Sequence, residues 1–236
     1  ELWGKHLEFV DNDQNHLTLA VCKFYHLLLP RSLLNTVLSH KFYKSTKSKR
    51  IKAMASFFSS TRDGDIQTIT LEKPKQHNVL NPDDMAVLQG AFEELAMDTS
   101  IRVLVLTGEG KSFCAGADLG ELKDYNFGAN PLENLTDAIE NFPCPTICRL
   151  NGGVYGGGTD LALACDFRVG MTGMKCFIPP ARIGIHYHPV GMARAVVRIG
   201  LGPAKRLFLA LDTMGGRELK EVGFLDYLVA DKEELD

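Results

Sequence analysis

The chain reads Ser112-Phe113-Cys114-Ala115-Gly116-Ala117-Asp118-Leu119 and, further along, Asn151-Gly152-Gly153-Val154-Tyr155-Gly156-Gly157-Gly158-Thr159-Asp160. Each stretch follows a predicted strand and precedes a predicted helix, and its small side chains leave backbone N–H groups uncovered. Two such N–H groups that point at one atom form an oxyanion hole, which stabilises negative charge on a carbonyl oxygen. The two glycine-rich turns therefore predict a site for chemistry that passes through an enolate.

Both turns differ from the glycine-rich loops that bind nucleotides. Residues 108–112 resemble the end of a phosphate-binding P-loop, but that motif requires glycine where the chain has Val105. The dinucleotide-binding motif requires glycine at position 154 or 155, and these positions hold Val154 and Tyr155. The Gly-x-Ser-x-Gly motif of a nucleophilic serine does not occur in the sequence. Taken singly, each turn is also compatible with an ordinary tight connection in an α/β protein.

Hydrophobic patterns around the turns predict alternating strands and helices. Residues 65–71 alternate polar and apolar side chains, which indicates a strand with one covered face. Asn81 and Pro82 suit the cap and the first position of a helix, whose apolar residues then recur every three or four positions. The other predicted strands are 101–107, 145–150 and 167–169, the other helices are 134–141 and 159–165, and residues 217–229 hold a short helix and a short strand. Repeated strand–turn–helix units predict an α/β fold with right-handed parallel crossovers.

Composition and charge fit a globular protein and argue against several partners. Of the 236 residues, 45% are hydrophobic and 23% are charged, as in soluble globular proteins. A net charge of −3 gives no reason to expect DNA or an anionic membrane as a partner. Charged residues and proline interrupt the apolar stretch 17–38, so no membrane span is expected. The six cysteines contain no Cys-x-x-Cys pair, which predicts buried free thiols and no metal site.

Residues 1–53 differ in composition from the rest of the chain. No acidic residue occurs between Gln14 and Arg62, whereas basic residues recur throughout. Such a basic leader is typical of an organelle transit peptide, which would direct the protein to mitochondria or peroxisomes. The first methionine is Met54, however, so residues 1–53 could equally be a non-native translated segment of a cytoplasmic protein. Both interpretations leave residues 54–236 as the folded domain.

The motif Phe-x-Ala-Gly-Ala-Asp-Leu at 113–119, followed by Asn151-Gly152, by Gly156-Gly157-Gly158 and by Asp160, resembles the crotonase family, the enoyl-CoA hydratase/isomerase superfamily. The resemblance extends from about residue 65 to residue 236. It implies a crotonase-like ββα superhelix with parallel sheets, in which the C-terminal helical part is expected to be missing. It also implies that the backbone N–H groups of Ala117 and Gly157 polarise the thioester carbonyl of an acyl-CoA. Gly157, at a helix N-terminus, would add the positive potential of the helix dipole.

The resemblance also predicts which residues hold the substrate. The loop 75–81 matches the family segment that cradles coenzyme A, so the expected binding residues are Lys75, Gln76, Val79, Ala115, Ala117 and Gly156. Lys75 would contact a phosphate of coenzyme A, although a solvated surface lysine is the alternative interpretation. The CoA thioester is itself the substrate, and no metal or redox cofactor is implied.

One catalytic carboxylate of the family is kept and the other is replaced. The hydratases of the family use two glutamates; Asp160 stands at the position of the first, and Pro180 stands at the position of the second. Hydration needs water activation at one carbon and protonation at the other, a task that two carboxylates share. A single carboxylate can still shift a double bond by moving one proton, so isomerisation is favoured over hydration. The alternative role of Asp160 is to cap its helix or to bind a nearby arginine.

Tyr187 and His188 are two further catalytic candidates. Tyr187 matches a tyrosine of the methylmalonyl-CoA decarboxylases of the superfamily, which also carry proline at the position of Pro180. Those enzymes have histidine where this chain has Ala117. His188 matches the position of a second acid in dienoyl-CoA isomerases, and a histidine can relay a proton near neutral pH. Surface histidines beside a packed tyrosine are the alternative interpretation.

The sequence thus predicts an acyl-CoA-processing enzyme of fatty acid metabolism, of isomerase or hydratase type, that holds a thioester enolate between Ala117 and Gly157. The alternatives are a methylmalonyl-CoA-like decarboxylase and a non-catalytic homologue that binds acyl-CoA or RNA. The resemblance further implies a homotrimer or a dimer of trimers, provided that the C-terminal helices are present.

Overall fold

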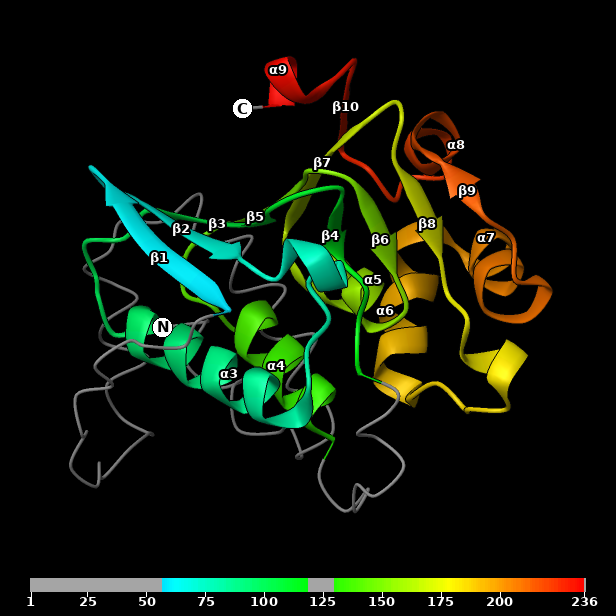
Figure 1. Cartoon of the computed structure of the whole chain (residues 1–236), viewed down its shortest axis with the longest axis horizontal. Helices are drawn as coiled ribbons and strands as arrows, with labels where there is room; N and C mark the ends of the chain where they lie inside the picture. The colour runs from blue at the N-terminus through cyan, green and yellow to red at the C-terminus, as the bar shows by residue number, and fades with distance from the viewer. Residues whose placement is uncertain (1–56, 119–129, 236) are drawn as a thin grey trace, which may run out of the picture. The chain divides into compact units, whose positions relative to one another are not determined.

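The computed structural model describes residues 57–118 and 130–235 of the chain (Figure 1). The basic leader 1–53 and its two interpretations lie outside the described residues. Leu119, the last residue of the first glycine-rich stretch, also lies outside them.

The larger of two sheets contains six strands in the order β1-β2-β3-β5-β7-β10. Its strands are β1 (Phe58–Asp63), β2 (Ile66–Leu71), β3 (Val103–Gly108), β5 (Thr146–Leu150), β7 (Phe167–Met171) and β10 (Tyr227–Val229). β1 pairs with β2 antiparallel, whereas every other neighbouring pair in this sheet is parallel. The strands predicted from the sequence all belong to this sheet, and the predicted α/β fold with parallel strands is confirmed.

The smaller sheet carries the two glycine-rich stretches. Its four strands, in the order β4-β6-β8-β9, are β4 (Ser112–Cys114), β6 (Gly153–Tyr155), β8 (Lys175–Phe177) and β9 (Met214–Gly215). β4 and β6 run parallel, with Ser112 opposite Gly153. The sequence pattern predicts turns for these residues, whereas they form short strands. Strands of three residues have no visible alternation in sequence, and the partners that pair with β4 and β6 lie far away in the chain.

Helices connect and cover the strands. They are α3 (Pro82–Ala96), α4 (Pro131–Glu140), α5 (Gly157–Ala164), α6 (Pro189–Ile199), α7 (Leu201–Lys205), α8 (Gly216–Glu221) and α9 (Lys232–Leu235). Short 3-10 helices occur at Pro74–Gln76 and Pro180–Ile183, and a π-helical turn occurs at Arg206–Ala210. α3 begins where the sequence predicts, because Asn81 accepts the N–H of Asp84 at 2.7 Å while the Asp84 carboxylate accepts the N–H of Asn81 at 3.0 Å.

Two helices begin earlier than the sequence pattern predicts. α4 begins at Pro131 because the side chain of Asn130 caps it by accepting the N–H groups of Leu132 and Glu133. α5 begins at Gly157 because Gly156, with a φ of 51°, turns the chain sharply into the helix. The N–H of Gly157 therefore lies in the first turn of α5, where the helix itself supplies no acceptor.

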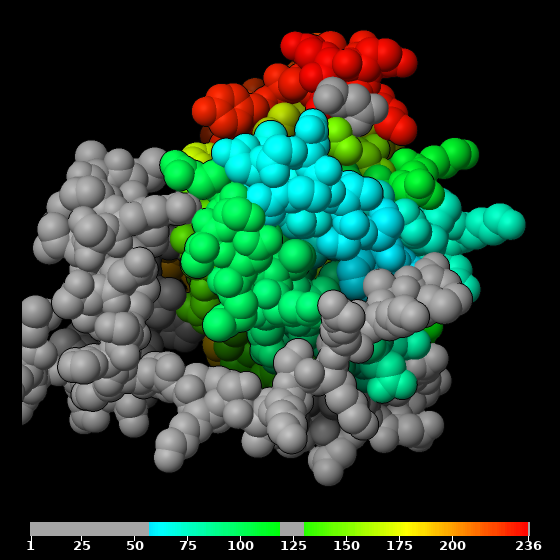
Figure 2. Space-filling view, turned by 90° about the vertical axis from the view of Figure 1, so that its left-hand side faces the viewer, coloured from blue at the N-terminus to red at the C-terminus, as the bar shows by residue number. Residues whose placement is uncertain are grey.

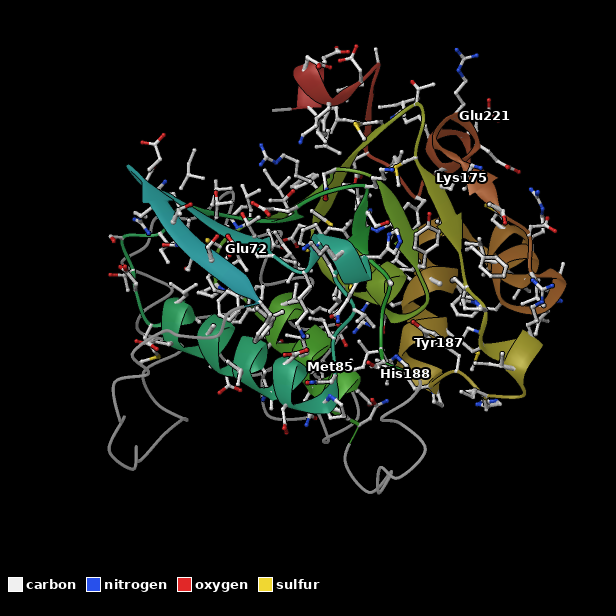
Figure 3. The ribbon with its side chains drawn as sticks, in the orientation of Figure 1. Glu72, Met85, Lys175, Tyr187, His188 and Glu221 are labelled. Carbon is white, nitrogen blue, oxygen red and sulfur yellow. The ribbon has the colours of Figure 1, made fainter. Side chains whose placement is uncertain are left out.

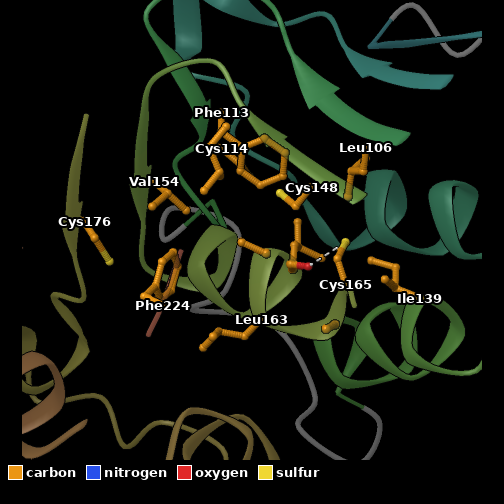
Figure 4. Close-up of a cluster of buried hydrophobic side chains, with 14 of the residues drawn as sticks. Leu106, Phe113, Cys114, Ile139, Cys148, Val154, Leu163, Cys165, Cys176 and Phe224 are labelled. Carbon is orange, nitrogen blue, oxygen red and sulfur yellow. Dashed lines mark hydrogen bonds between the residues drawn. The ribbon is translucent and has the colours of Figure 1, made fainter. Parts of the chain in front are cut away.

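The core is assembled around α5, all of whose residues are buried. Figure 4 shows side chains gathered around this helix from β4 and β6, from the larger sheet and from α4; among them are Phe113, Cys114, Val154, Leu106, Cys148 and Ile139. Burial raises the pKa of the Cys114 and Cys176 thiols to about 12, so both stay protonated at neutral pH. The prediction of buried free thiols is confirmed for these two and for Cys148 and Cys165.

Helices cover one face of the larger sheet at the end that contains β1. Figure 1 shows α3 and α4 below β1, β2 and β3, and the two helices contact each other. β1 is one of the two edge strands of this sheet, β10 being the other, and Figure 2 shows the residues of β1 and β2, in cyan, at the surface. None of the helices within residues 57–118 and 130–235 has the length and apolar character needed to cross a lipid bilayer.

Candidate active site

The two glycine-rich stretches meet where β4 and β6 end. Because these strands are parallel neighbours, both segments leave the sheet at the same edge. A Cβ atom on Gly116 would overlap the backbone nitrogen of Gly157, and the φ of 86° at Gly116 also favours glycine. A Cβ atom on Gly158 would overlap the carbonyl oxygen of Cys114. Glycine at these positions thus allows one backbone to approach the other.

Two backbone N–H groups lie close together at this contact. An ideal Cβ position on Gly157 is only 3.6 Å from the backbone nitrogen of Ala117. No described residue accepts a hydrogen bond from the N–H of Ala117 or from the N–H of Gly157. Gly157 is the first residue of α5, where the helix dipole adds positive potential. The predicted oxyanion hole would use these two N–H groups, neither of which bonds to the described part of the chain.

Two cavities share Ala115 and Ala117 in their walls. The larger, which we call the groove, has a volume of about 590 Å³ and is lined in addition by Gln76, His77, Val79, Asp118 and Tyr155. The smaller, which we call the pocket, has a volume of about 210 Å³ and is lined by Gly156, Gly157, Tyr187 and His188 and by parts of α3, α4 and the segment 179–186. A molecule that spans both cavities would lie against Ala115 and Ala117.

Most of the predicted substrate-binding residues line these cavities. Gln76, Val79, Ala115 and Ala117 line the groove, and Gly156 lines the pocket. Lys75 is exposed and lines neither cavity. Three groove residues, His77, Asp118 and Tyr155, are not among the binding residues predicted from the sequence. The sequence could have indicated them, because His77 lies in the loop 75–81 and the other two lie in the glycine-rich stretches.

Asn78 fixes the loop that forms one wall of the groove. Its side chain is fully buried, and its Nδ2 donates to the carbonyl oxygens of Ser112 at 2.9 Å and of Phe113 at 3.0 Å. Its Oδ1 accepts the N–H of Lys73 at 2.8 Å. The adjacent His77 places its Nδ1 2.9 Å from the Ser112 Oγ. These bonds attach the loop to β4 and hold the groove wall against the first glycine-rich stretch.

Asp160 lies in the first turn of α5 and is only 1% exposed. Its Oδ1 accepts a hydrogen bond from Arg194 Nη1 at 2.5 Å, and its Oδ2 lies 2.7 Å from His188 Nε2. The alternative prediction, that Asp160 binds a nearby arginine, is confirmed. His188 lines the pocket and Asp160 does not, so His188 is the member of this pair that a molecule in the pocket would meet.

Arg194 connects Asp160 to α4. It is 8% exposed, and its Nη2 donates to Glu140 Oε2 at 2.9 Å. Burial by itself lowers the pKa of the Arg194 guanidinium, but the negative charges of Asp160 and Glu140 outweigh burial and raise that pKa. Removing one partner of such a buried pair leaves an uncompensated charge. Arg194 therefore fixes the position of the Asp160 carboxylate.

Tyr187 and His188 line the pocket from the segment before α6, and Met85 lines it from α3 (Figure 3). The rings of Tyr187 and His188 are stacked, with centroids 5.0 Å apart and an interplanar angle of 25°. Burial and the negative charge of Asp160 raise the pKa of Tyr187 well above its ordinary value, so its hydroxyl stays protonated. The alternative interpretation, that these are surface histidines, fits the exposed His186 but not His188, whose side chain is 10% exposed.

Asp160 determines which nitrogen of His188 carries the proton. An ionised carboxylate only accepts hydrogen bonds, so Nε2 is the protonated nitrogen of the neutral ring. Nδ1 then carries the lone pair and accepts the N–H of Gly191 at 3.3 Å, a bond that also caps α6. His188 can therefore gain a proton at Nδ1 while Asp160 holds the other side of the ring.

Because Gly191 has no side chain, His188, Tyr187 and Asp160 can pack against its Cα. A Cβ atom at this position would lie 2.6 Å from His188 Nε2, 2.7 Å from a ring carbon of Tyr187 and 2.8 Å from Asp160 Oδ2. Gly191 and Arg194 are not among the site residues predicted from the sequence. The signal that could have found them is their spacing, since residues 188, 191 and 194 recur every three positions and share one face of α6.

Pro180 lines the pocket at the position where the resemblance places a second glutamate. Among the described residues that line the pocket there is no aspartate or glutamate, and the titratable side chains are His186, Tyr187 and His188. No group of three or more His, Cys, Asp or Glu side chains that could hold a metal ion occurs in the described part of the chain. The described pocket wall thus offers histidine rather than a pair of carboxylates.

Comparisons with known proteins identify the family. Residues 61–236 match the family model described as enoyl-CoA hydratase/isomerase. The chain is 30% identical over 177 residues to the crotonyl-CoA hydratase of Syntrophomonas wolfei, with 71% of this chain and 67% of that protein covered. It is 29% identical over 181 residues to the short-chain-enoyl-CoA hydratase of Clostridium acetobutylicum, with 73% and 68% covered. The crystal structure of an enoyl-CoA hydratase from Bacillus anthracis matches with a TM-score of 0.69 at 30% identity, over 74% of this chain and 70% of that one.

The chain spans about half to two thirds of the length of the curated relatives that it matches. The matched region includes both glycine-rich stretches, and the similarity to solved structures confirms the predicted crotonase-like fold. The family model covers most of the chain, and this protein therefore belongs to the enoyl-CoA hydratase/isomerase family.

Proposed function

We propose that this protein processes an acyl-CoA thioester by holding its enolate between the N–H groups of Ala117 and Gly157. The observation that carries the proposal is this pair of N–H groups, which have no described protein acceptor and lie where the groove meets the pocket. The groove would take the coenzyme A moiety, and the pocket would take the acyl group. Charge develops on the thioester oxygen as the α-carbon loses a proton, so two donors at that oxygen stabilise the enolate more than the substrate.

His188 is the proposed proton carrier, because it lines the pocket and the lone pair of its neutral ring lies on Nδ1. To take a proton there, the ring would give up the long 3.3 Å hydrogen bond from the N–H of Gly191. In a 3-enoyl-CoA, Nδ1 would take a proton from the carbon beside the thioester carbonyl, and the C–H electron pair would move into a dienolate. Return of the proton to the γ-carbon would give the 2-enoyl-CoA isomer. Asp160 and Arg194 would position His188 without touching the substrate. A proton moves and no electrons leave the substrate, so the step requires no redox cofactor.

Hydration is the competing reaction, since the two relatives named above are hydratases. The pocket favours isomerisation, because Pro180 replaces a carboxylate that would share the activation of water. The names of the relatives do not favour the decarboxylase or the non-catalytic alternative.

The test is to incubate the protein separately with 3-hexenoyl-CoA, crotonyl-CoA and methylmalonyl-CoA, and to separate the products by liquid chromatography with mass detection. We expect 2-hexenoyl-CoA from the first substrate. A 3-hydroxyacyl product from crotonyl-CoA alone would make the protein a hydratase, and loss of carbon dioxide from methylmalonyl-CoA would make it a decarboxylase. Thermal stabilisation by acyl-CoA without any product would contradict the enzymatic proposal.

A homotrimer or a dimer of trimers is the second part of the proposal. Exposed apolar side chains support an assembly, among them Val197, Leu201 and Leu209, which are 88%, 56% and 68% exposed. Single apolar side chains are common on monomers, so the measurement has to be direct. Light scattering coupled to size-exclusion chromatography gives the mass of the assembly, and a monomer would contradict this part of the proposal.

A further inference from the structure

Glu133 lies next to His188 but has no role in the site described above. It belongs to the first turn of α4, and its Oε2 is 3.8 Å from His188 Nδ1. The same oxygen is 3.5 Å from Asn130 Nδ2, and Asn130 lines the pocket. Glu133 is thus a carboxylate close to the histidine of a pocket in which Pro180 replaces the expected glutamate.

Glu133 lies near Nδ1 of His188, which is the nitrogen that would exchange its proton in the proposed reaction. Nε2 is fixed by its hydrogen bond to Asp160, so a proton gained by the ring is carried on Nδ1. In the neutral ring Nδ1 accepts the N–H of Gly191 at the long distance of 3.3 Å. Protonation removes that bond, and the new N–H needs an acceptor. At 3.8 Å, Oε2 of Glu133 lies within about 1 Å of hydrogen-bond distance from Nδ1, and the half-buried side chain would accept that N–H by moving closer.

Exposure increases along this series of side chains. The side chain of Asp160 is 1% exposed, that of His188 is 10% exposed and that of Glu133 is 34% exposed. The three groups therefore lead from the core beside α5 to solvent. Proton transfer between a histidine and a carboxylate that reaches water is ordinary acid–base chemistry at neutral pH.

We propose that Glu133 exchanges the proton of His188 with solvent while the enolate is bound, a role that rests on the proposed function of His188. The Nδ1–H of the imidazolium passes its proton to Oε2 of Glu133, and Nδ1 regains its lone pair. The glutamic acid then gives the proton to water and becomes a carboxylate again. The reverse steps bring a solvent proton to Nδ1, from which it reaches a carbon of the enolate. Glu133 acts only through His188 and does not touch the substrate.

The experiment measures deuterium in the product of isomerisation. The protein converts 3-hexenoyl-CoA in D₂O, and mass spectrometry gives the deuterium content of 2-hexenoyl-CoA for each turnover. Glu133→Gln keeps an oxygen for Asn130 but cannot relay the proton, so we expect the deuterium content per turnover to fall roughly tenfold while product formation falls much less. Glu93→Gln is the control. Glu93 is an exposed carboxylate on α3 that accepts a hydrogen bond from Gln89 Nε2 at 2.7 Å and lines neither the groove nor the pocket, so its variant should keep the deuterium content of the wild type.

Three results would overturn the proposal, and they can be told apart. Equal deuterium content in the wild type and Glu133→Gln would show that Glu133 is not the relay, although the proposed function would stand. The same holds for a wild-type product without deuterium, because no exchange would then occur. If the wild type gives neither product nor deuterium in the recovered substrate, the proposed function fails and the role of Glu133 fails with it.

Discussion

The two halves of the candidate active site are built from different parts of the chain. The oxyanion half consists of the backbone N–H groups of Ala117 and Gly157, which small residues bring together where β4 and β6 end. The proton-transfer half consists of side chains, since His188 bonds Asp160 and Asp160 bonds Arg194. The first half therefore depends on backbone shape, whereas the second depends on every partner of a buried ion pair. Substitutions that change only one of the two halves test this difference.

The largest effect is expected in the proton-transfer half, from Arg194→Met. The variant leaves the Asp160 carboxylate buried without its guanidinium partner. We expect the free energy of unfolding to fall by about 3–5 kcal/mol, measured by urea denaturation. The double variant Arg194→Met with Asp160→Asn removes the buried charge as well and should recover part of that loss. If Arg194→Met unfolds at the same urea concentration as the wild type, the ion pair does not hold this half together.

In the oxyanion half, Gly157→Pro removes one N–H donor. We expect the transition state to lose about 3 kcal/mol of stabilisation, which corresponds to a fall of more than about a hundredfold in turnover. Gly157→Ala is the control, because alanine keeps the N–H. Its Cβ would overlap only the flexible end of Leu132, at 2.9 Å, and would be at ordinary contact distance, 3.6 Å, from the Ala117 nitrogen. Coenzyme A binding, followed by thermal shift, should survive in both variants. Equal losses of turnover in both variants would mean that the added side-chain volume at position 157, and not the loss of the N–H donor, reduces turnover.

His188→Asn removes the proposed proton carrier but keeps a side chain that caps α6 well. We expect turnover to fall by roughly a hundredfold, with the binding of coenzyme A unchanged because the groove is intact. The exposed His186 lines the same pocket, so His186→Asn provides the control and should retain most of the activity. Comparable losses in the two variants would assign no special role to His188.

The oxyanion half could be predicted from sequence because its requirements are local. Gly116 and Gly156 adopt φ values of 86° and 51°, which restrict these positions to glycine and leave a visible motif. The larger sheet was predictable for a similar reason, since its buried parallel strands are short apolar runs bounded by turns. The short strands β4 and β6 were not, because pairing with strands distant in the sequence makes them strands: β4 pairs with β6, and β6 also pairs with β8.

The proton-transfer half could be predicted only in part, because its contacts join distant positions. Asp160 lies 28 positions from His188 and 34 positions from Arg194, while Arg194 lies 54 positions from Glu140. A sequence shows that Asp160 and His188 are titratable but not which of them faces the pocket. His188 lines the pocket and Asp160 does not, because Asp160 belongs to α5, all of whose residues are buried.

The smallest effect is expected outside both halves, from Lys75→Ala. Lys75 is exposed and lines neither the groove nor the pocket, so any contact with a phosphate of coenzyme A would be solvated. Solvated ion pairs contribute about 0–1 kcal/mol, so KM should rise by less than about fivefold and kcat should not change. Added salt should reduce even this difference, because it screens exposed charges. A larger rise in KM would mean that coenzyme A extends beyond the groove, and that the position of the thioester at Ala117 depends on a surface side chain as well as on backbone shape.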